Sequence, residues 1–326
     1  MIKKCCIVTF VYGRKYQCFI PLYILSLFNA YPGYDLRIYV DGKINKKVMS
    51  SVRYLQSKFT NFEILSSGDI LPELSKKTKH YQQIERSKRW LFYDKAFLDY
   101  SGIYIGDIDL LIFKEKQSLF NQHFENCICF KRCFSNISRI GKKKNDNIVS
   151  KVKNCLKFGP FYTYKFYKEK NQDIIKYSGL HFVIPNEYFS FINKKRKMFA
   201  DELNRLAEKK SEKYNLCSFN NEQFLRDIII DSGLDELPVC ESKTYNNETN
   251  PKSINFRPHH GIHLGIFRNK QLIKIEEKLI NSEYYRDFFN KFLNLMNCDE
   301  YLFLKGNFSR FLNKIIHNLL EAYRRF

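Results

Sequence analysis

The sequence has little glycine and proline, with 13 and 8 residues respectively among 326. It has no C-x-x-C pair, no repeat at a fixed period and no apolar run approaching the roughly 18 residues that cross a bilayer. These absences argue against a zinc ribbon, a redox pair, a solenoid and a membrane-spanning protein. The 44% hydrophobic and 16% aromatic content instead predicts a globular protein with a large core.

A secretory signal and a disulfide framework are also not expected. The start, MIKKCCIVTFVYG, has only a short apolar run and no small-residue cleavage site, so it predicts a first strand. The ten cysteines show no disulfide or metal spacing and predict reduced thiols in a cytoplasmic protein. Adjacent Cys5 and Cys6 are expected on opposite faces of that strand, as small buried hydrophobes.

The net charge is +21, from 55 Lys and Arg against 34 Asp and Glu. The cations are scattered in short runs at 142–144, 194–197 and 209–210 and do not form one tail. Nucleic acid, anionic lipid and phosphorylated substrates all fit this excess, and so does a solvated lysine-rich surface.

The N-terminal third alternates strand-like and helix-like patterns. Strands are expected at 5–11, 36–40 and 62–65, with helices at 18–30 and 45–59 between them. This order predicts an α/β sheet with parallel strands, in which ligands lie beyond the carboxyl ends of the strands. Three such ends fall at 8–12, 40–42 and 106–109.

The rest of the chain is less regular. A helix is expected over 80–100, carrying Arg86, Lys88, Arg89 and Lys95, which either reach the acidic corner described next or form a solvated face. A long surface excursion is expected over 135–175, a glycine-interrupted strand over 177–185, and helices over 187–210 and 220–231, the latter capped by Asn220. The tail 301–326 carries one apolar stripe, which either docks on the body or lies on a membrane surface.

The acidic corner is the stretch 104-YIGDIDL-110, where a strand ends after Gly106. A bend there brings the carboxylates of Asp107 and Asp109 toward one ligand. Carboxylate oxygens suit Mg²⁺ or Mn²⁺, which bind substrate phosphates with one or two protein carboxylates. The corner therefore predicts a divalent cation between Asp109 and a diphosphate, with two solvated aspartates as the alternative.

In this order, the segments 6-CIVTFVYG-13, Arg89, 104-YIGDIDLLIF-113, 177-YSGLHFV-183 and 221-NEQFL-225 resemble the nucleotide-sugar-dependent glycosyltransferases of the GT-A type. The resemblance implies a Rossmann-like, mixed and mostly parallel sheet flanked by helices. It implies a catalytic domain over 1–268, with its nucleotide part at about 1–113 and its acceptor side at about 114–268, and a helical region over 269–326. The donor-binding residues that it implies are Thr9, Val11, Tyr12, Asp41, Arg89, Asp107, Gly179, His181 and Arg268.

The stretch 257-RPHHGIHLG-265 is similar to the C-terminal histidine motif of retaining family 8 members. The resemblance implies that His263 completes a metal set with Asp107 and Asp109, which suits manganese. The usual Lys-Pro-Trp is replaced by Ile266, Phe267 and Arg268. Either Arg268 does the lysine's phosphate work or the family differs, and the structural alternative is that the histidines are satisfied within a glycine-rich turn.

The predicted function is transfer of a sugar from a nucleoside-diphosphate sugar to a glycan, with Mn²⁺ or Mg²⁺ as cofactor. The metal and nearby cations would hold the leaving diphosphate's charge. An inverting enzyme would use Glu222 as base, with Asp235 or Glu236 in reserve, whereas a retaining one would leave Gln223 near the sugar. The sequence leaves both outcomes open.

The expected donor is a nucleotide sugar, with a UDP-sugar preferred. The expected acceptor is a cell-surface polysaccharide or lipid-linked oligosaccharide, met in the cytoplasm or at the inner face of the cell membrane. A D-x-D-x-T phosphatase is disfavoured because Leu111 stands where the threonine would be. A basic nucleic-acid-binding protein without enzymatic activity is the remaining alternative, although no such binding motif is present.

Overall fold

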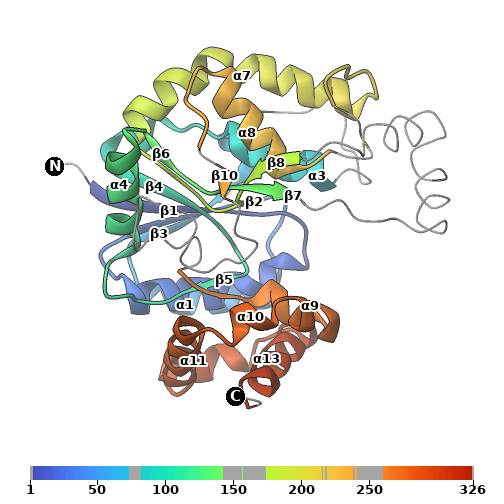
Figure 1. The fold of residues 1–326 in the computed structure, drawn as a ribbon. Helices are drawn as coiled ribbons and strands as arrows, with labels where there is room; N and C mark the ends of the chain where they lie inside the picture. The colour runs from blue at the N-terminus through green and yellow to red at the C-terminus, as the bar shows by residue number, and fades with distance from the viewer. Residues whose placement is uncertain are drawn as a thin grey trace.

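The computed structural model describes residues 3–72, 82–141, 156, 174–214, 216, 219–237, 239–240 and 260–324. A six-stranded sheet in the order β3-β2-β1-β4-β9-β6 lies at the centre (Figure 1). Its strands are β1 (Lys3–Val11), β2 (Asp35–Val40), β3 (Phe62–Ser66), β4 (Tyr100–Asp107), β6 (Phe134–Ser135) and β9 (His181–Val183). The strands from β3 to β4 run parallel, and β9 is antiparallel to β4 and β6. This mixed, mostly parallel sheet confirms the predicted fold class.

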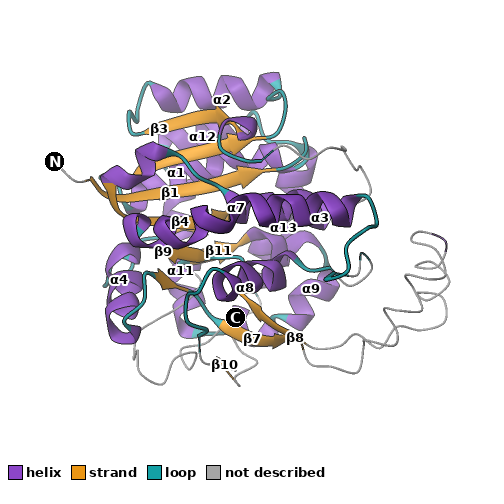
Figure 2. Ribbon diagram, turned by 90° about the horizontal axis from the view of Figure 1, so that it is seen from above, coloured by secondary structure: helices purple, strands orange, loops and turns teal. Residues whose placement is uncertain are grey.

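The sheet separates two apolar layers because successive side chains of a strand point to opposite faces. Cys5 belongs to one buried cluster and Cys6 to the other, which confirms their expected orientations. The first layer contains α1 (Ile20–Ala30), α2 (Lys46–Gln56) and α4 (Leu119–Phe130), and the second contains α7 (Pro185–Ala207) and α8 (Asn221–Asp231). Figure 1 shows α7 and α8 on one side of the sheet and α1 on the other, and Figure 2 shows the strands side by side from β3 towards β9.

Side-chain caps define where two of the predicted helices begin. The side chain of Asn45 accepts a hydrogen bond from the backbone N–H of Lys47 at 2.9 Å, which starts α2. The side chain of Asn220 accepts one from the N–H of Glu222 at 2.8 Å, which starts α8 as the sequence predicts. Each cap satisfies an N–H group that has no partner within the helix.

The single helix predicted over 80–100 is wrong. The described part is a short α3 (Gln82–Ser87), followed by 3₁₀ helices η3 (Lys88–Leu91) and η4 (Lys95–Asp99). The backbone is extended at Phe92 and Asp94, and the Asp94 side chain caps η4 by accepting from the N–H of Ala96 at 2.9 Å. Asp94 also pairs with Arg37 at 3.0 Å, so it stabilises the break twice.

Two small sheets flank the main one. β5 (Leu110–Ile112) pairs antiparallel with β11 (Gly261–His263), and β10 (Val239–Cys240), β7 (Ser138–Gly141) and β8 (Ile174–Tyr177) form the other. The strand predicted over 177–185 is split, because Ser178, Gly179 and Leu180 separate β8 from β9. Most of the excursion predicted over 135–175 and the lysine run at 142–144 lie outside the described residues.

The C-terminal region is helical, as predicted. It contains α9 (Lys270–Ile275), α10 (Glu277–Ile280), α11 (Glu283–Met296), α12 (Asp299–Lys305) and α13 (Arg310–Tyr323). The tail is therefore two helices and not one, since α12 ends at Lys305 with Gly306 as its C-terminal cap, and Ser309 caps α13 through the N–H of Leu312. None of the described helices is long and apolar enough to span a bilayer. The domain boundary at 268 stays a prediction.

The apolar stripe of the tail docks on the body of the protein. Leu312, Ile315 and Leu319 of α13 are at most 1% exposed and belong to the same buried cluster as α1. The side chain of Asn318 donates to the carbonyl of Phe267 at 2.8 Å, which ties α13 to the 3₁₀ helix η5 (Leu264–Arg268). Of the two outcomes that the sequence left open, this arrangement corresponds to docking, and the stripe is not available to a membrane surface.

Candidate metal and nucleotide-sugar site

The acidic corner forms where β4 ends and β5 begins. Asp107 is the last residue of β4 and Asp109 precedes β5, with buried Ile108 between them. β11 pairs with β5 in a register that sets His263 opposite Leu110, and the N–H of Leu264 donates to the carbonyl of Asp109 at 2.7 Å. The late strand therefore brings an imidazole to the two carboxylates.

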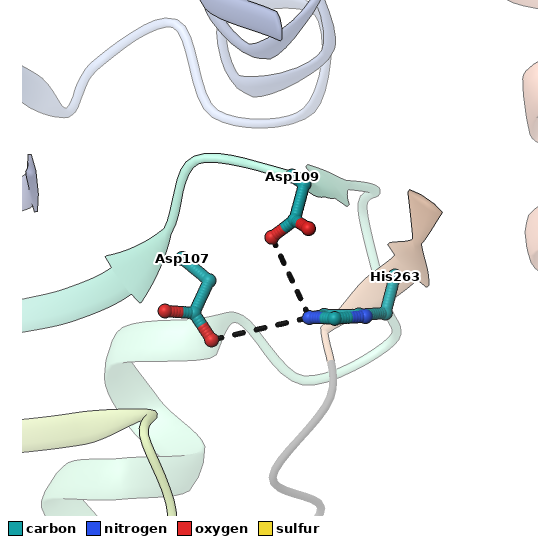
Figure 3. A group of neighbouring side chains, drawn as sticks. All are labelled: Asp107, Asp109 and His263. Carbon is teal, nitrogen blue, oxygen red and sulfur yellow. Dashed lines mark ion pairs between the residues drawn. The ribbon is translucent and has the colours of Figure 1, made fainter. Parts of the chain in front are cut away.

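The three side chains converge (Figure 3). Nε2 of His263 lies 3.5 Å from Oδ1 of Asp109 and 3.9 Å from Oδ2 of Asp107, and the three potential ligand atoms all lie within 4.8 Å of one another. Ligands around a six-coordinate ion with bonds of about 2.1 Å stand roughly 3 to 4 Å apart. Two carboxylate oxygens and one imidazole nitrogen also suit a divalent ion such as manganese. The residues present fit a divalent metal.

In each of the two carboxylates, the oxygen that is not paired with His263 contacts an arginine. Nη1 of Arg89 lies 2.6 Å from Oδ1 of Asp107, and Nη2 of Arg268 contacts Oδ2 of Asp109. Burial would raise the pKa of Asp107, but Arg89 and His263 outweigh it and hold that pKa far below its usual range. Burial would lower the pKa of His263, but Asp109 and Asp107 outweigh it and raise that pKa. Asp107 is therefore held as an anion, which is the form that binds a metal.

Two cavities meet at this cluster. The arginine-lined cavity has a volume of about 240 Å³ and is bordered by Arg86, Arg89 and Arg268, together with Tyr12 and Tyr16. The leucine-lined cavity has a volume of about 290 Å³ and is bordered by apolar residues and carboxylates, which are Leu180, Ile266, Leu272, Leu279, Glu222 and Glu276. Asp107, Glu222 and His263 line both cavities. The candidate metal cluster therefore stands between a cationic space and a largely apolar one.

The predicted reacting-face residues lie at the start of α8. Oε2 of Glu222 forms an ion pair with Nζ of Lys176 at 3.0 Å, and Glu222 borders both cavities. Gln223 follows it and is half-buried, but it is not among the described residues that line either cavity. The reserve carboxylates, Asp235 and Glu236, are exposed, and Glu236 pairs with Arg226 at 2.5 Å.

Two glycines leave the site open. A Cβ at Gly179 would lie 3.0 Å from Nη2 of Arg89 and 3.4 Å from Oδ2 of Asp107. A Cβ at Gly265 would lie 2.7 Å from Cε1 of His263 and 2.9 Å from Oδ2 of Asp109. Any side chain at these positions would push on the carboxylates, the imidazole or the guanidinium.

Four residues predicted to bind the donor are placed elsewhere. Thr9 and Val11 are buried within β1, and Asp41 is exposed after β2, where its N–H donates to the carbonyl of Val11 at 3.0 Å. His181 is fully buried among aromatic rings, and its Nδ1 lies 2.9 Å from Nδ2 of Asn136. None of the four lines the two cavities formed by the described residues.

Two neighbouring histidines of the C-terminal motif have different surroundings. His260 is fully buried, with Nδ1 2.8 Å from Oε1 of Glu115 and Nε2 2.9 Å from Nε2 of His123. Its carbonyl accepts from the N–H of Phe113 at 2.9 Å. His260 therefore fits the alternative in which the histidines are satisfied within the protein, whereas His263 faces the carboxylates. His259 lies outside the described residues.

Sequence reasoning missed Tyr16, Asn221, Lys176 and Glu276 at the site. Tyr16 follows the first strand in the 3₁₀ helix η1 (Tyr16–Phe19), and its position after a strand end was an available signal. Lys176 had no such signal, because its ion pair with Glu222 depends on how β8 lies against α8.

Comparison with known proteins found similarity only to solved structures, and that similarity is low. No family model and no curated protein matches the sequence. Solved structures that match include the galactosyltransferase LgtC in complex with donor and acceptor sugar analogs, at 10% identity and a TM-score of 0.34 over 68% of this chain and 70% of that one. The mannosyltransferase Ktr4p from S. cerevisiae matches at 9% identity and a TM-score of 0.41, over 68% of this chain and 64% of its own.

The bifunctional glycosyltransferase WbbM, in its apo structure, matches at 14% identity and a TM-score of 0.39 over 94% of this chain. The match covers 52% of WbbM, so the chain spans less than two thirds of the Ktr4p and WbbM chains. All three are glycosyltransferases by name. At this level of likeness no activity, substrate or metal is transferred from them to this chain.

Proposed function

We propose that the chain is a metal-dependent glycosyltransferase of the GT-A type, which moves a sugar from a nucleoside-diphosphate sugar to a glycan acceptor. The observation that carries the proposal is the Asp107, Asp109 and His263 cluster at the carboxyl end of β4, beside a cavity bordered by three arginines. In open α/β sheets this edge is where nucleotides bind.

The arginine-lined cavity suits the diphosphate of the donor. When bound, a divalent metal at the cluster would offset the charge of the phosphates. Arg86, Arg89 and Arg268 supply planar donors that match phosphate oxygens. The ring of Tyr16 lies near both Arg86 and Arg268, at 5.8 and 5.1 Å from their guanidinium carbons, so it fixes this cationic wall.

The leucine-lined cavity suits the acceptor. Its carboxylates, Glu222 and Glu276, are hydrogen-bond acceptors for sugar hydroxyls, and its apolar residues offer a surface for a sugar face. Glu222 borders both cavities, which makes it the first choice for the base of an inverting enzyme. A retaining enzyme would instead have Gln223 or a similar group near the reacting face of the sugar.

The finer expectations rest on the sequence. A UDP-sugar donor, Mn²⁺ rather than Mg²⁺, and a cell-surface or lipid-linked glycan acceptor are parts of the proposal, as is a cytoplasmic location. The lipid-linked acceptor was inferred from the basic amphipathic tail at 301–326. Because the apolar stripe of α13 is buried, the tail no longer supports that acceptor.

A thermal-shift screen tests the proposal. Nucleotides and nucleotide sugars are added to the protein with and without Mn²⁺, since a ligand that binds only the folded state raises the melting temperature. A shift that requires both metal and a nucleoside diphosphate supports the proposal. If no nucleotide or nucleotide sugar raises the melting temperature, with or without Mn²⁺, and nucleic acid binds in a salt-dependent way, the nucleic-acid-binding alternative is favoured.

A further inference from the structure

A third cavity lies between the N-terminal sheet and the C-terminal helices. It has a volume of about 360 Å³ and is bordered by the segment 14–18, the start of α2 and the start of α13. The segment 14–18 borders two cavities, since Tyr16 lines the arginine-lined cavity and Lys15 lines this one. We call this third cavity, of about 360 Å³, the cationic cavity.

Four cations surround this space without carboxylate partners. Arg14, Lys15, Lys47 and Arg310 line it, all four are exposed, and no aspartate or glutamate is among its described lining residues. None of the four forms an ion pair with a described carboxylate, whereas Arg89 and Arg268 at the metal cluster are both paired. Like charges held together around a concave space favour an anion there.

The backbone adds to this charge. α2, of 11 residues, and α13, of 14 residues, both begin at the cavity, where Asn45 and Ser309 are their caps and line the wall. The N-terminal end of a helix carries partial positive charge and N–H groups that favour anions. Two helix starts and four cations from three separate segments therefore face one space.

Apolar side chains complete the wall. Pro21, Val48, Phe308 and Phe311 line the cavity, and Nζ of Lys15 lies 4.1 Å from the centre of the Phe311 ring. A simple inorganic anion would leave this apolar surface unused. The composition suits an anionic group attached to a carbon skeleton.

We propose that the cationic cavity binds a phosphate ester, separately from the metal cluster. Two arginines and two lysines suit the several acceptor oxygens of a phosphate better than the two of a carboxylate, and the apolar wall accommodates the organic part of the ligand. The same chemistry is offered by a soluble phosphate ester and by the head group of a phospholipid. The site needs neither the metal nor the proposed sugar transfer.

The test uses the full chain in a phosphate-free buffer with EDTA, so that metal-dependent binding at the cluster is absent. Glycerol 3-phosphate is titrated calorimetrically against the parent protein and against the double variant Lys47→Ala, Arg310→Ala. The matched control is Lys46→Ala, Lys314→Ala, which removes two exposed cations from the same helices without touching the cavity wall. We expect saturable binding that weakens on the order of tenfold or more in the cavity variant and stays near the parent value in the control.

Vesicles separate the two sources of the ligand. Co-sedimentation with phosphatidylcholine vesicles containing phosphatidic acid is measured for the same three proteins. Binding to vesicles without binding to glycerol 3-phosphate, when it is lost only in the cavity variant, identifies a lipid head group. No saturable binding to either probe, or equal weakening in both double variants, would overturn the site, because either result means diffuse surface charge only.

Discussion

Nε2 of His263 lies 3.5 Å from Oδ1 of Asp109, although Asp109 follows β4 and His263 is the last residue of β11. The pairing of β5 with β11 creates this contact. That pairing requires a glycine at 261, since a Cβ there would lie 1.7 Å from the carbonyl oxygen of Leu111. The candidate metal site therefore depends on backbone packing as much as on its ligands.

Replacing Asp109 should remove the metal. Asp109→Asn keeps the size of a side chain that is 4% exposed but takes away an anionic ligand. Loss of outer contacts alone lowers metal affinity about 10–100-fold, so loss of a ligand should lower Mn²⁺ affinity by about a hundredfold or more. Calorimetric titration with Mn²⁺, and with Mn²⁺ plus a nucleoside diphosphate, measures this.

The same variant should remain folded. Arg268, which loses its charged partner, is 31% exposed and stays accessible to water. A circular dichroism spectrum and melting curve close to those of the parent serve as the control. A folded Asp109→Asn protein that transfers or hydrolyses the donor sugar at the parent rate would contradict the metal role.

Gly265→Ala should disturb the ligands without removing any of them. The added methyl group would meet Cε1 of His263 at 2.7 Å and Oδ2 of Asp109 at 2.9 Å, so one of these must move. We expect Mn²⁺ affinity to fall about tenfold or more. The control is Gly33→Ala, whose Cβ meets nothing within 4 Å. Equal metal affinity in the two variants would show that Gly265 is not needed for the cluster.

The sequence predicted the local parts of this structure. The alternation of short apolar runs identified β1, β2 and β3, and the D-x-D after Gly106 identified the corner, because these features depend on neighbouring residues. It failed where the fold overrides periodicity. The predicted helix over 80–100 breaks at Phe92, because Asp94 is held by both Arg37 and the N–H of Ala96.

The sequence also predicted part of the candidate site. Asp107, Asp109, Arg89, Arg268 and His263 lie together, and their roles at a metal and a donor stay predictions. The resemblance implied that His181 binds the donor, but His181 belongs to β9 and its side chain is fully buried, since the two faces of a strand alternate. Which face a short strand buries depends on its partner strands, and the local pattern did not reveal this.

Glu222→Gln tests the proposed base. The substitution keeps the shape of the side chain but removes its basicity and its ion pair with Lys176. For an inverting enzyme the rate should fall on the order of a hundredfold or more, while donor affinity stays within a few-fold of the parent. The control is Glu187→Gln, the same change at an exposed position in the first turn of α7. Unchanged turnover would exclude Glu222 as the base, and would either move that role to Asp235 or Glu236 or favour a retaining reaction.

Stability should fall in mild acid because of His181. Burial, and then the charge of Arg89, lower its pKa from 6.5 to about 3 in the folded protein. Between these values the unfolded chain takes up a proton that the folded protein refuses, so the stability present above about pH 6.5 is lost as the pH falls toward 3. Burial also lowers the pKa of His123, which acts in the same direction.

His181→Phe isolates this contribution. Phenylalanine preserves ring packing against Trp90 and Tyr188 but does not titrate. The free energy of unfolding in urea, measured from pH 7.5 to 4.5, should decline less steeply for the variant than for the parent, with the exposed His317→Phe as control. Parallel pH profiles for His181→Phe and the parent would show that protonation of the buried imidazole does not lower the free energy of unfolding.

Leu319→Ala tests whether the tail belongs to the core. Leu319 is 0% exposed in the cluster that α13 shares with α1, and truncating a buried leucine costs about 2–5 kcal/mol of unfolding free energy. Leu302→Ala is the matched control, because that side chain is 56% exposed and should cost under about 0.5 kcal/mol. Urea denaturation of both variants measures the difference. If Leu319→Ala is as stable as Leu302→Ala and instead loses co-sedimentation with anionic vesicles, the stripe contacts a membrane, and a lipid-linked acceptor regains the support that docking removes.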